Sequence, residues 1–354
     1  MKKVYIQGVG SVSSQKTFNN DEFLNEICVY NDNVISVIDP VYKDYIPPAA
    51  ARRMAKGIKM STVASKLALL DAGLENVDAI ITGTGMGCLV DSEKFVSALI
   101  DNKEEYLTPT SFIQSTHNTV GGQIALGLEC KGYNFTYVHG SSSFEASLID
   151  AKMQLEENEA ETILVGGVDE LGEHTVKIHK LIHHIKPTAV SSENLLASKT
   201  EGAVFSEGAN FFVLANENNS GSYAELVDVD IFNTMSVHNL SNAIFEFLKK
   251  NDLRLEDIDV LGLGNNGDIA FDGYYDALSN GIFANTQQIY YKHLCGEFNT
   301  ASSFGTWLAS KILKEQRIPK EVVKNNFKAT KLETILLYNQ YRGENHSFTL
   351  LRKC

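Results

Sequence analysis

The chain has 354 residues, of which 44% are hydrophobic and 21% are charged, as expected for a globular protein with a substantial core. Its formal net charge of −13 at pH 7 argues against nucleic acid or an anionic membrane as a partner. The 5 cysteines include no CxxC pair, which argues against a zinc ribbon or a disulfide framework.

The N-terminal segment predicts a strand over 3–8 that ends in glycines. It contains no apolar run of signal-peptide or membrane length, so we expect a cytoplasmic protein. Apolar residues at helical spacing predict a long helix over 50–73, closed by Gly73. A buried strand over 77–82 then leads into a glycine-rich turn.

A helix over 92–101 and a loop over 107–119 precede the most informative stretch, 134–170. This stretch predicts a buried strand, a sharp turn at Gly140 and Ser141, a helix and a second buried strand. The turn places Ser141 in the first helical turn, where free N–H groups and the helix dipole can stabilise an anion. Chemistry that forms an oxyanion would suit this position, although a serine here can also simply cap the helix.

Histidines are frequent between 174 and 184, in a stretch that looks like an insertion, and a strand pair is predicted over 203–215. His179 and His183 have a spacing that could hold a metal, but no HExxH glutamate or cysteine accompanies them. The glycines over 262–267 match GxGxxG, but no acidic ribose partner follows. We therefore expect neither a metal nor a cofactor.

The second half of the chain repeats the first. The strand over 223–232 corresponds to the opening strand, the helix over 239–250 to the long helix, and residues 255–268 to residues 74–87. Because the strands are hydrophobic throughout, we predict buried parallel or mixed sheets that are covered by helices.

The region around Ser141, which closes in Gly166 and Gly167, resembles the nucleophile region of β-ketoacyl-acyl-carrier-protein synthases of the thiolase superfamily. The segments KKVYIQGVGS, RRMAKGIK and EGAVFSEGANFFVL are similar to other parts of that family. The segment LTPTSFIQSTHNT resembles the variant in aryl-polyene and flexirubin-type pathways. The resemblance implies an α/β, thiolase-like fold of five layers, α-β-α-β-α, built from two pseudo-repeated halves, residues 1–217 and 218–354.

Active members of that family pair a cysteine with two histidines, and the resemblance implies that this chain departs from all three. Ser141 takes the place of the cysteine, and the turn GLGNNGD places Asn266 at one histidine position. The turn KHLCGE keeps Lys292 but places Glu297 at the other histidine position. The shorter NQYRGENHS replaces a glycine-rich loop that helps form the oxyanion hole. Because several catalytic elements change together, we expect that condensation chemistry has been lost.

Elementary chemistry supports this expectation. A serine hydroxyl needs a neighbouring base, whereas a cysteine at a helix N-terminus can ionise unaided. An ionised Glu297 would repel a malonyl carboxylate and the enolate that decarboxylation forms, although Asn266 could still donate a hydrogen bond to a thioester oxygen. The resemblance also implies substrate contacts at His117, Phe144 and Asn339.

The leading hypothesis is a non-catalytic subunit of the chain-length-factor type, which binds an acyl carrier protein and pairs with a competent ketosynthase or with a second copy of itself. It would act in fatty acid, polyketide or aryl-polyene biosynthesis. One alternative is an active acyltransferase or thioesterase that uses Ser141, with His117 as a possible helper. Another is a homodimer that serves only as an assembly subunit.

Overall fold

The computed structural model describes residues 2–354 and contains a mixed ten-stranded sheet in the order β10-β9-β11-β12-β8-β1-β7-β5-β3-β4. Its strands are β1 (Tyr5–Val12), β3 (Ala79–Gly83), β4 (Tyr133–Tyr137), β5 (Thr162–Asp169), β7 (Gly208–Ala215), β8 (Ala224–Asn233), β9 (Val260–Leu263), β10 (Gln287–Tyr290), β11 (Thr334–Tyr341) and β12 (Asn345–Arg352). Two short strands, β2 (Asn31–Asp32) and β6 (Val190–Ser191), pair separately.

The helices are α1 (Pro48–Ala51), α2 (Lys56–Ala72), α3 (Leu89–Asp101), α4 (Pro109–Ser115), α5 (Thr119–Leu128), α6 (Ser143–Glu157), α7 (Glu173–Leu181), α8 (Val237–Lys250), α9 (Gly273–Ser279), α10 (Lys292–Cys295) and α11 (Ser302–Glu315). Within residues 2–354, no helix has the length and apolar character needed to cross a bilayer.

The predicted internal repeat is confirmed by the strand order. Numbered along the chain within each half, the strands lie in the order third, second, fourth, fifth, first in both halves. The first strands of the two halves, β1 and β8, meet in antiparallel pairs at Tyr5–Glu225 and Ile6–Ala224. Two copies of one β/α unit therefore lie side by side.

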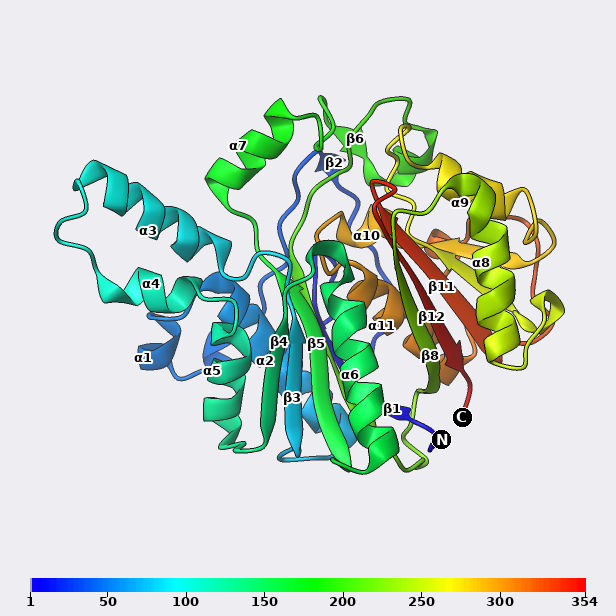
Figure 1. Cartoon of the computed structure of the whole chain (residues 1–354), viewed down its shortest axis with the longest axis horizontal. Helices are drawn as coiled ribbons and strands as arrows, with labels where there is room; N and C mark the ends of the chain where they lie inside the picture. Colours follow the sequence, from blue (N-terminus) through cyan, green and yellow to red (C-terminus); the bar gives the residue numbers. More distant parts are fainter. Residues whose placement is uncertain (1) are drawn as a thin grey trace.

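The five predicted layers are also confirmed (Figure 1). Helices α2 and α5 cover the outer face of the first half, and α8 and α9 cover that of the second. Helices α6 and α11 lie between the halves and contact strands of both. Helix α11 is buried on all sides, with Phe304, Trp307 and Leu308 at most 1% exposed, because sheets cover both of its faces.

Three predicted elements differ from the structure. The long helix divides into α1 and α2, because Ala55 is extended (φ −57°, ψ 157°). The predicted loop over 107–119 contains α4, which starts at Pro109, a position where proline needs no N–H. Of the strand pair over 203–215, only β7 forms, and Phe205 makes isolated bridges to Val34 and Glu297.

The strand before Ser141 was predicted to be buried, and this is wrong. Strand β4 lies at the edge of the sheet, and among the described strands it pairs only with β3. Tyr133 and Phe135 are 43% and 45% exposed. The hydrophobic run was correctly identified as a strand, but its outer side has no neighbour within residues 2–354.

Candidate active site

A 3-10 turn, η2 (Gly140–Ser142), leads directly into α6 and carries Ser141. Gly140 has φ +55°, a left-handed conformation that glycine adopts without strain. The N–H of His139 donates to Oγ of Ser143 over 2.8 Å and so fixes the turn. The strand, turn and helix predicted around Ser141 are therefore present, and Ser141 itself is buried.

Strand β12 of the second half closes over this turn. Nδ2 of Asn345 donates to Oγ of Ser141 over 3.1 Å, and Oγ of Ser347 donates to Oε1 of Glu145 over 2.8 Å. Burial raises the pKa of Glu145. Ser141 receives a hydrogen bond from an amide, but within residues 2–354 no imidazole or carboxylate is hydrogen-bonded to its hydroxyl.

Asn266, Lys292 and Glu297, which the resemblance assigned to the family's active site, form one buried cluster. The ammonium of Lys292 lies 2.9 and 2.7 Å from the two oxygens of Glu297, and Nδ2 of Asn266 donates to one of them over 2.7 Å. Lys292 and Glu297 are 1% and 2% exposed. The oxygen of Asn266 accepts from the N–H of Asp268. The carboxylate charge is thus balanced inside the protein by the ammonium group.

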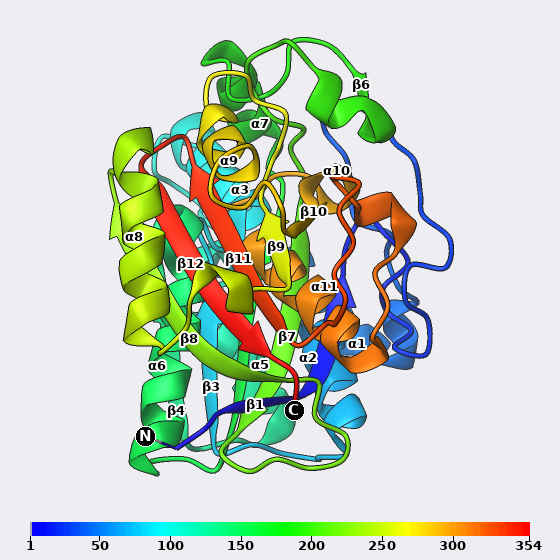
Figure 2. The same ribbon diagram turned by 90° about the vertical axis from the view of Figure 1, so that its right-hand side faces the viewer.

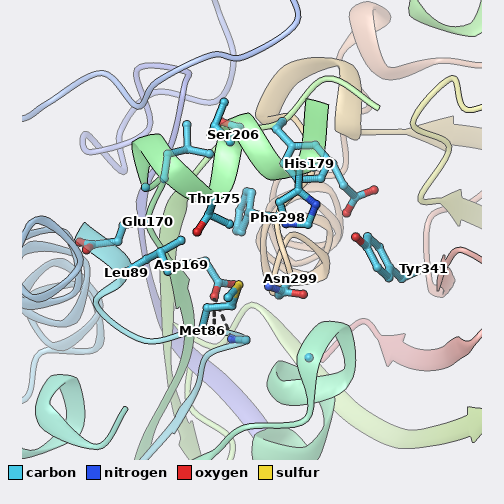
Figure 3. A pocket seen from close by; sticks show the side chains of 17 residues that line it. Met86, Leu89, Asp169, Glu170, Thr175, His179, Ser206, Phe298, Asn299 and Tyr341 are labelled. Carbon is cyan, nitrogen blue, oxygen red and sulfur yellow. Dashed lines mark hydrogen bonds between the residues drawn. The ribbon is translucent and has the colours of Figure 1, made fainter. Parts of the chain in front are cut away.

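A cavity of about 200 Å³ borders Gly140 of the turn and Glu297 of the cluster, whereas Ser141, Asn266 and Lys292 do not line it. It is lined by Gly140 and Glu297, and also by Gly85, Met86, Leu89, Asp169, Glu170, Leu171, Gly172, Thr175, Val176, His179, Phe205, Ser206, Phe298, Asn299 and Tyr341. Figure 3 shows Asp169, His179, Asn299 and Tyr341 around it. The lining includes three carboxylates and one imidazole but no lysine or arginine.

Asp169 is a structural centre of the site that the sequence analysis did not identify. Its carboxylate accepts from the N–H groups of Gly85 and Thr300, both at 2.8 Å, and from the hydroxyl of Thr300 at 2.9 Å. It thereby ties the loop after β3 to the start of α11. An acidic residue at the end of a buried strand would have been a usable signal.

Glu170, the next residue, also lines the cavity and binds two backbone N–H groups. Its oxygens accept from the N–H of Gly57 at 2.5 Å and that of Val90 at 2.8 Å. Burial raises the pKa of Glu170 to about 7, because desolvation outweighs these two hydrogen bonds. The group therefore titrates near neutral pH beside the cavity.

The histidines take places that the sequence did not predict. Helix α7 ends at Leu181, so His179 and His183 do not share a helical face; Nδ1 of His179 instead lies 3.1 Å from Nδ1 of His184. No group of three potential metal ligands occurs in residues 2–354. His117 is exposed between α4 and α5, and its ring packs near Gly87. It does not line the cavity.

Two other predicted contact residues lie away from the cavity. Phe144 is fully buried in the core, with its ring centroid 5.6 Å from that of Phe212. It belongs to the hydrophobic core cluster that also contains Phe212, Phe304 and Trp307. Asn339 is buried on β11, and its oxygen would lie 2.4 Å from a Cβ at Gly264. Neither side chain reaches the cavity wall.

Residues 34–220 match the family profile described as "Beta-ketoacyl synthase, N-terminal domain". Among curated proteins, none matches the sequence.

Solved structures are similar over the whole chain. The ishigamide ketosynthase/chain length factor has a TM-score of 0.81 at 18% identity, covering 100% of this chain and 99% of that one. A β-ketoacyl synthase from Burkholderia phymatum STM815 has a TM-score of 0.80 at 16% identity, covering 100% of both chains. A ketosynthase in complex with its chain length factor from Xenorhabdus doucetiae has a TM-score of 0.78 at 15% identity, covering 100% of this chain and 98% of that one. The fold is therefore thiolase-like.

Proposed function

Since the chain belongs to the β-ketoacyl synthase family, we propose that it is a subunit without condensing activity of its own, which pairs with a competent ketosynthase. This role is that of a chain length factor in fatty acid, polyketide or aryl-polyene biosynthesis. Two of the similar structures carry a ketosynthase and a chain length factor in their titles, which supports the proposal.

The buried pair of Lys292 and Glu297 is the observation that carries the proposal. Decarboxylative condensation needs hydrogen-bond donors at the thioester oxygen, where negative charge develops. Here the ammonium of Lys292 and the amide of Asn266 are both engaged by the Glu297 carboxylate. Both donors are therefore occupied inside the protein and are not available to a thioester oxygen.

The environment of Ser141 supports the same proposal. A serine nucleophile requires a base within hydrogen-bond reach. Its hydroxyl contacts the amide of Asn345, which donates a hydrogen bond and cannot remove a proton through it. The exposed His117 packs near Gly87 rather than at the cavity, so nothing in the geometry favours an acyl-serine mechanism.

The edge strand β4 is the surface that we assign to the partner subunit. Tyr133 and Phe135 stack with ring centroids 6.0 Å apart and are nearly half exposed. Leu126 on the neighbouring α5 is 72% exposed. An unpaired edge is a template for pairing with another strand, and exposed aromatic residues are frequent in interfaces. Helices α3 and α4 project from the molecule on the same side (Figure 1).

An acyl carrier protein is the second partner that we propose. Arg52 and Arg53 are exposed just after α1, and Lys59 on α2 is half-buried with its ammonium 5.5 Å from the ring of Tyr42. Such a cluster can dock an acidic partner in spite of the negative net charge. One similar structure contains an acyl carrier protein in complex with its ketosynthase, which supports this assignment.

Co-purification with a co-expressed ketosynthase from the same genome tests the pairing. We expect a heterodimer and a ketosynthase whose activity depends on this chain. Phe135→Asp should abolish association, whereas Phe245→Asp, at a phenylalanine that is similarly exposed on α8 (43%), should not. A ketosynthase that stays fully active and never associates would refute the proposal.

Intact mass after incubation with acyl- and malonyl-carrier proteins separates the alternatives. We expect no adduct. A stoichiometric acyl adduct that disappears in Ser141→Ala would establish the serine-dependent enzyme instead. A folded homodimer that binds neither ketosynthase nor carrier protein would leave the assembly-subunit alternative.

A further inference from the structure

The segment after α11 forms a groove of about 460 Å³ with an apolar floor and a basic rim. Its lining residues are Gln287, Ile318, Lys320, Val323, Asn325, Asn326, Phe327, Lys328, Ala329 and Leu332. None of them lines the cavity between Gly140 and Glu297. The segment is seen in orange near α11 in Figure 2.

Two of the apolar side chains on the floor of the groove are exposed to solvent. Phe327 is 44% exposed and Val323 is 37% exposed, although both are large hydrophobic residues. Ile318 and Leu332 are partly buried and pack against the central core, which anchors the groove to the body of the protein. An apolar hollow with a polar rim is typical of a site that receives a partner side chain.

Two lysines, Lys320 and Lys328, line the groove in a protein that has a net charge of −13. Of the other cations in residues 317–331, Arg317 lies 3.7 Å from Glu315, Lys324 lies 4.0 Å from Asp276 and Lys331 lies 2.7 Å from Glu333. Lys320 has a 91% exposed side chain and meets Glu321 only at 3.7 Å. Such an exposed pair contributes little, so the rim keeps a positive field.

The groove does not offer a strand edge. Val323 bridges Ile289 of β10, and the N–H of Lys324 donates to the carbonyl of Gln288 over 2.8 Å. The N–H of Gln288 is in turn held by the side chain of Asn325 over 3.0 Å. Because these backbone groups are engaged, we expect recognition there to use side chains, as in helix-in-groove binding.

From this combination we infer that the groove binds an acidic amphipathic helix of a partner protein. An apolar residue of the helix would enter the groove against Phe327, and flanking carboxylates would meet Lys320 and Lys328. The concave shape favours an inserted side chain over a flat lipid surface. This site goes beyond the proposed pairing through β4 and the proposed carrier contact at Arg52 and Arg53.

Fluorescence anisotropy with a labelled helical peptide of about 20 residues, with leucine on one face and glutamate on the other, tests the inference. We expect saturable binding that weakens with added salt. Lys320→Glu/Lys328→Glu should weaken it by at least about tenfold. Lys2→Glu/Lys43→Glu, the same charge change at exposed sites outside the groove, should leave it unchanged. Phe327→Ser should weaken binding without unfolding the chain, as checked by circular dichroism.

Three results would overturn the inference. The first is equal binding of a peptide with lysine in place of glutamate, and the second is binding that the groove variants leave intact. The third is a preference for vesicles of phosphatidylglycerol and phosphatidylcholine over the peptide. Failure of the β4 pairing would not affect this test, because Arg52→Glu/Arg53→Glu and Phe135→Asp should leave peptide binding intact.

Discussion

Asn345 lies with its Nδ2 3.1 Å from Oγ of Ser141, although the two residues are 204 positions apart in the sequence. The hairpin of β11 and β12 in the second half thus holds the hydroxyl that precedes α6 in the first half. The same strand holds Glu145 through Ser347. The hydroxyl of Ser141 is therefore held by an amide and enclosed by the hairpin.

Asn345→Ala removes this hydrogen bond and should lower the free energy of unfolding by about 1 kcal/mol. Urea denaturation measures the change. Asn326→Ala, at an exposed asparagine, is the control and should be neutral. Equal stability of Asn345→Ala and the wild type would mean that the contact does not contribute.

Ser141→Cys should not restore condensation. The variant would carry a better nucleophile, a thiol, at the start of the helix. Lys292 and Asn266, however, remain bound to Glu297. Release of carbon dioxide from a malonyl-carrier protein is the measurement, with an active ketosynthase as the positive control. Carbon dioxide release by the single variant would show that the Glu297 cluster is no obstacle.

The Lys292–Glu297 pair should behave as a coupled unit. Lys292→Met leaves a buried carboxylate with Asn266 as its remaining partner, and we expect a loss of about 3–5 kcal/mol of stability. Lys292→Met/Glu297→Leu removes both charges and should recover most of that loss. A double-mutant cycle from chemical denaturation gives the coupling energy. If the stability losses of the two single variants add up to that of the double variant, a direct interaction between Lys292 and Glu297 is contradicted.

Glu170 should make stability depend on pH. Its pKa is raised from 4.5 to about 7 in the folded chain. Between these values the folded state keeps a proton that the unfolded state loses, so its contribution is complete below pH 4.5 and disappears as pH rises through 7. This decline amounts to about 3 kcal/mol.

Comparison with Glu170→Gln isolates this contribution. The glutamine side chain does not titrate, so the informative quantity is the change in unfolding free energy between pH 4 and pH 8, at about which the two titrations of Glu170 are complete. The wild type should decline more steeply than the variant. Parallel curves would show that Glu170 has an ordinary pKa.

Lys186 should be needed for the loop that carries Asn266. Its buried ammonium donates to the carbonyl of Gly267 at 2.7 Å and to the hydroxyl of Ser198 at 2.8 Å. Lys186→Met leaves these acceptors unsatisfied and should reduce stability by about 3 kcal/mol. Lys199→Met, at an exposed lysine of the same segment, should change it little. Thermal unfolding of both variants provides the comparison.

The sequence determined the architecture because its signals are local or repetitive. Hydrophobic strands, helical periodicity and the correspondence of 255–268 with 74–87 indicated two similar halves, and the structure contains them. The turn at Ser141 was predictable for the same reason. The exposed side of β4 was not, since a hydrophobic strand has the same sequence pattern at an edge as at a centre.

Only the tertiary structure decided the chemistry of the site. Glu297 might have faced the cavity as an isolated charge, but folding places Lys292 and Asn266 against it. Phe144, expected to contact substrate, is in the core instead. Asp169 emerged as a centre because it joins Gly85 in the first half of the chain to Thr300 in the second. Electrostatic balance and hydrogen-bond partners depend on distances between remote residues, and packing of the two halves against each other sets those distances.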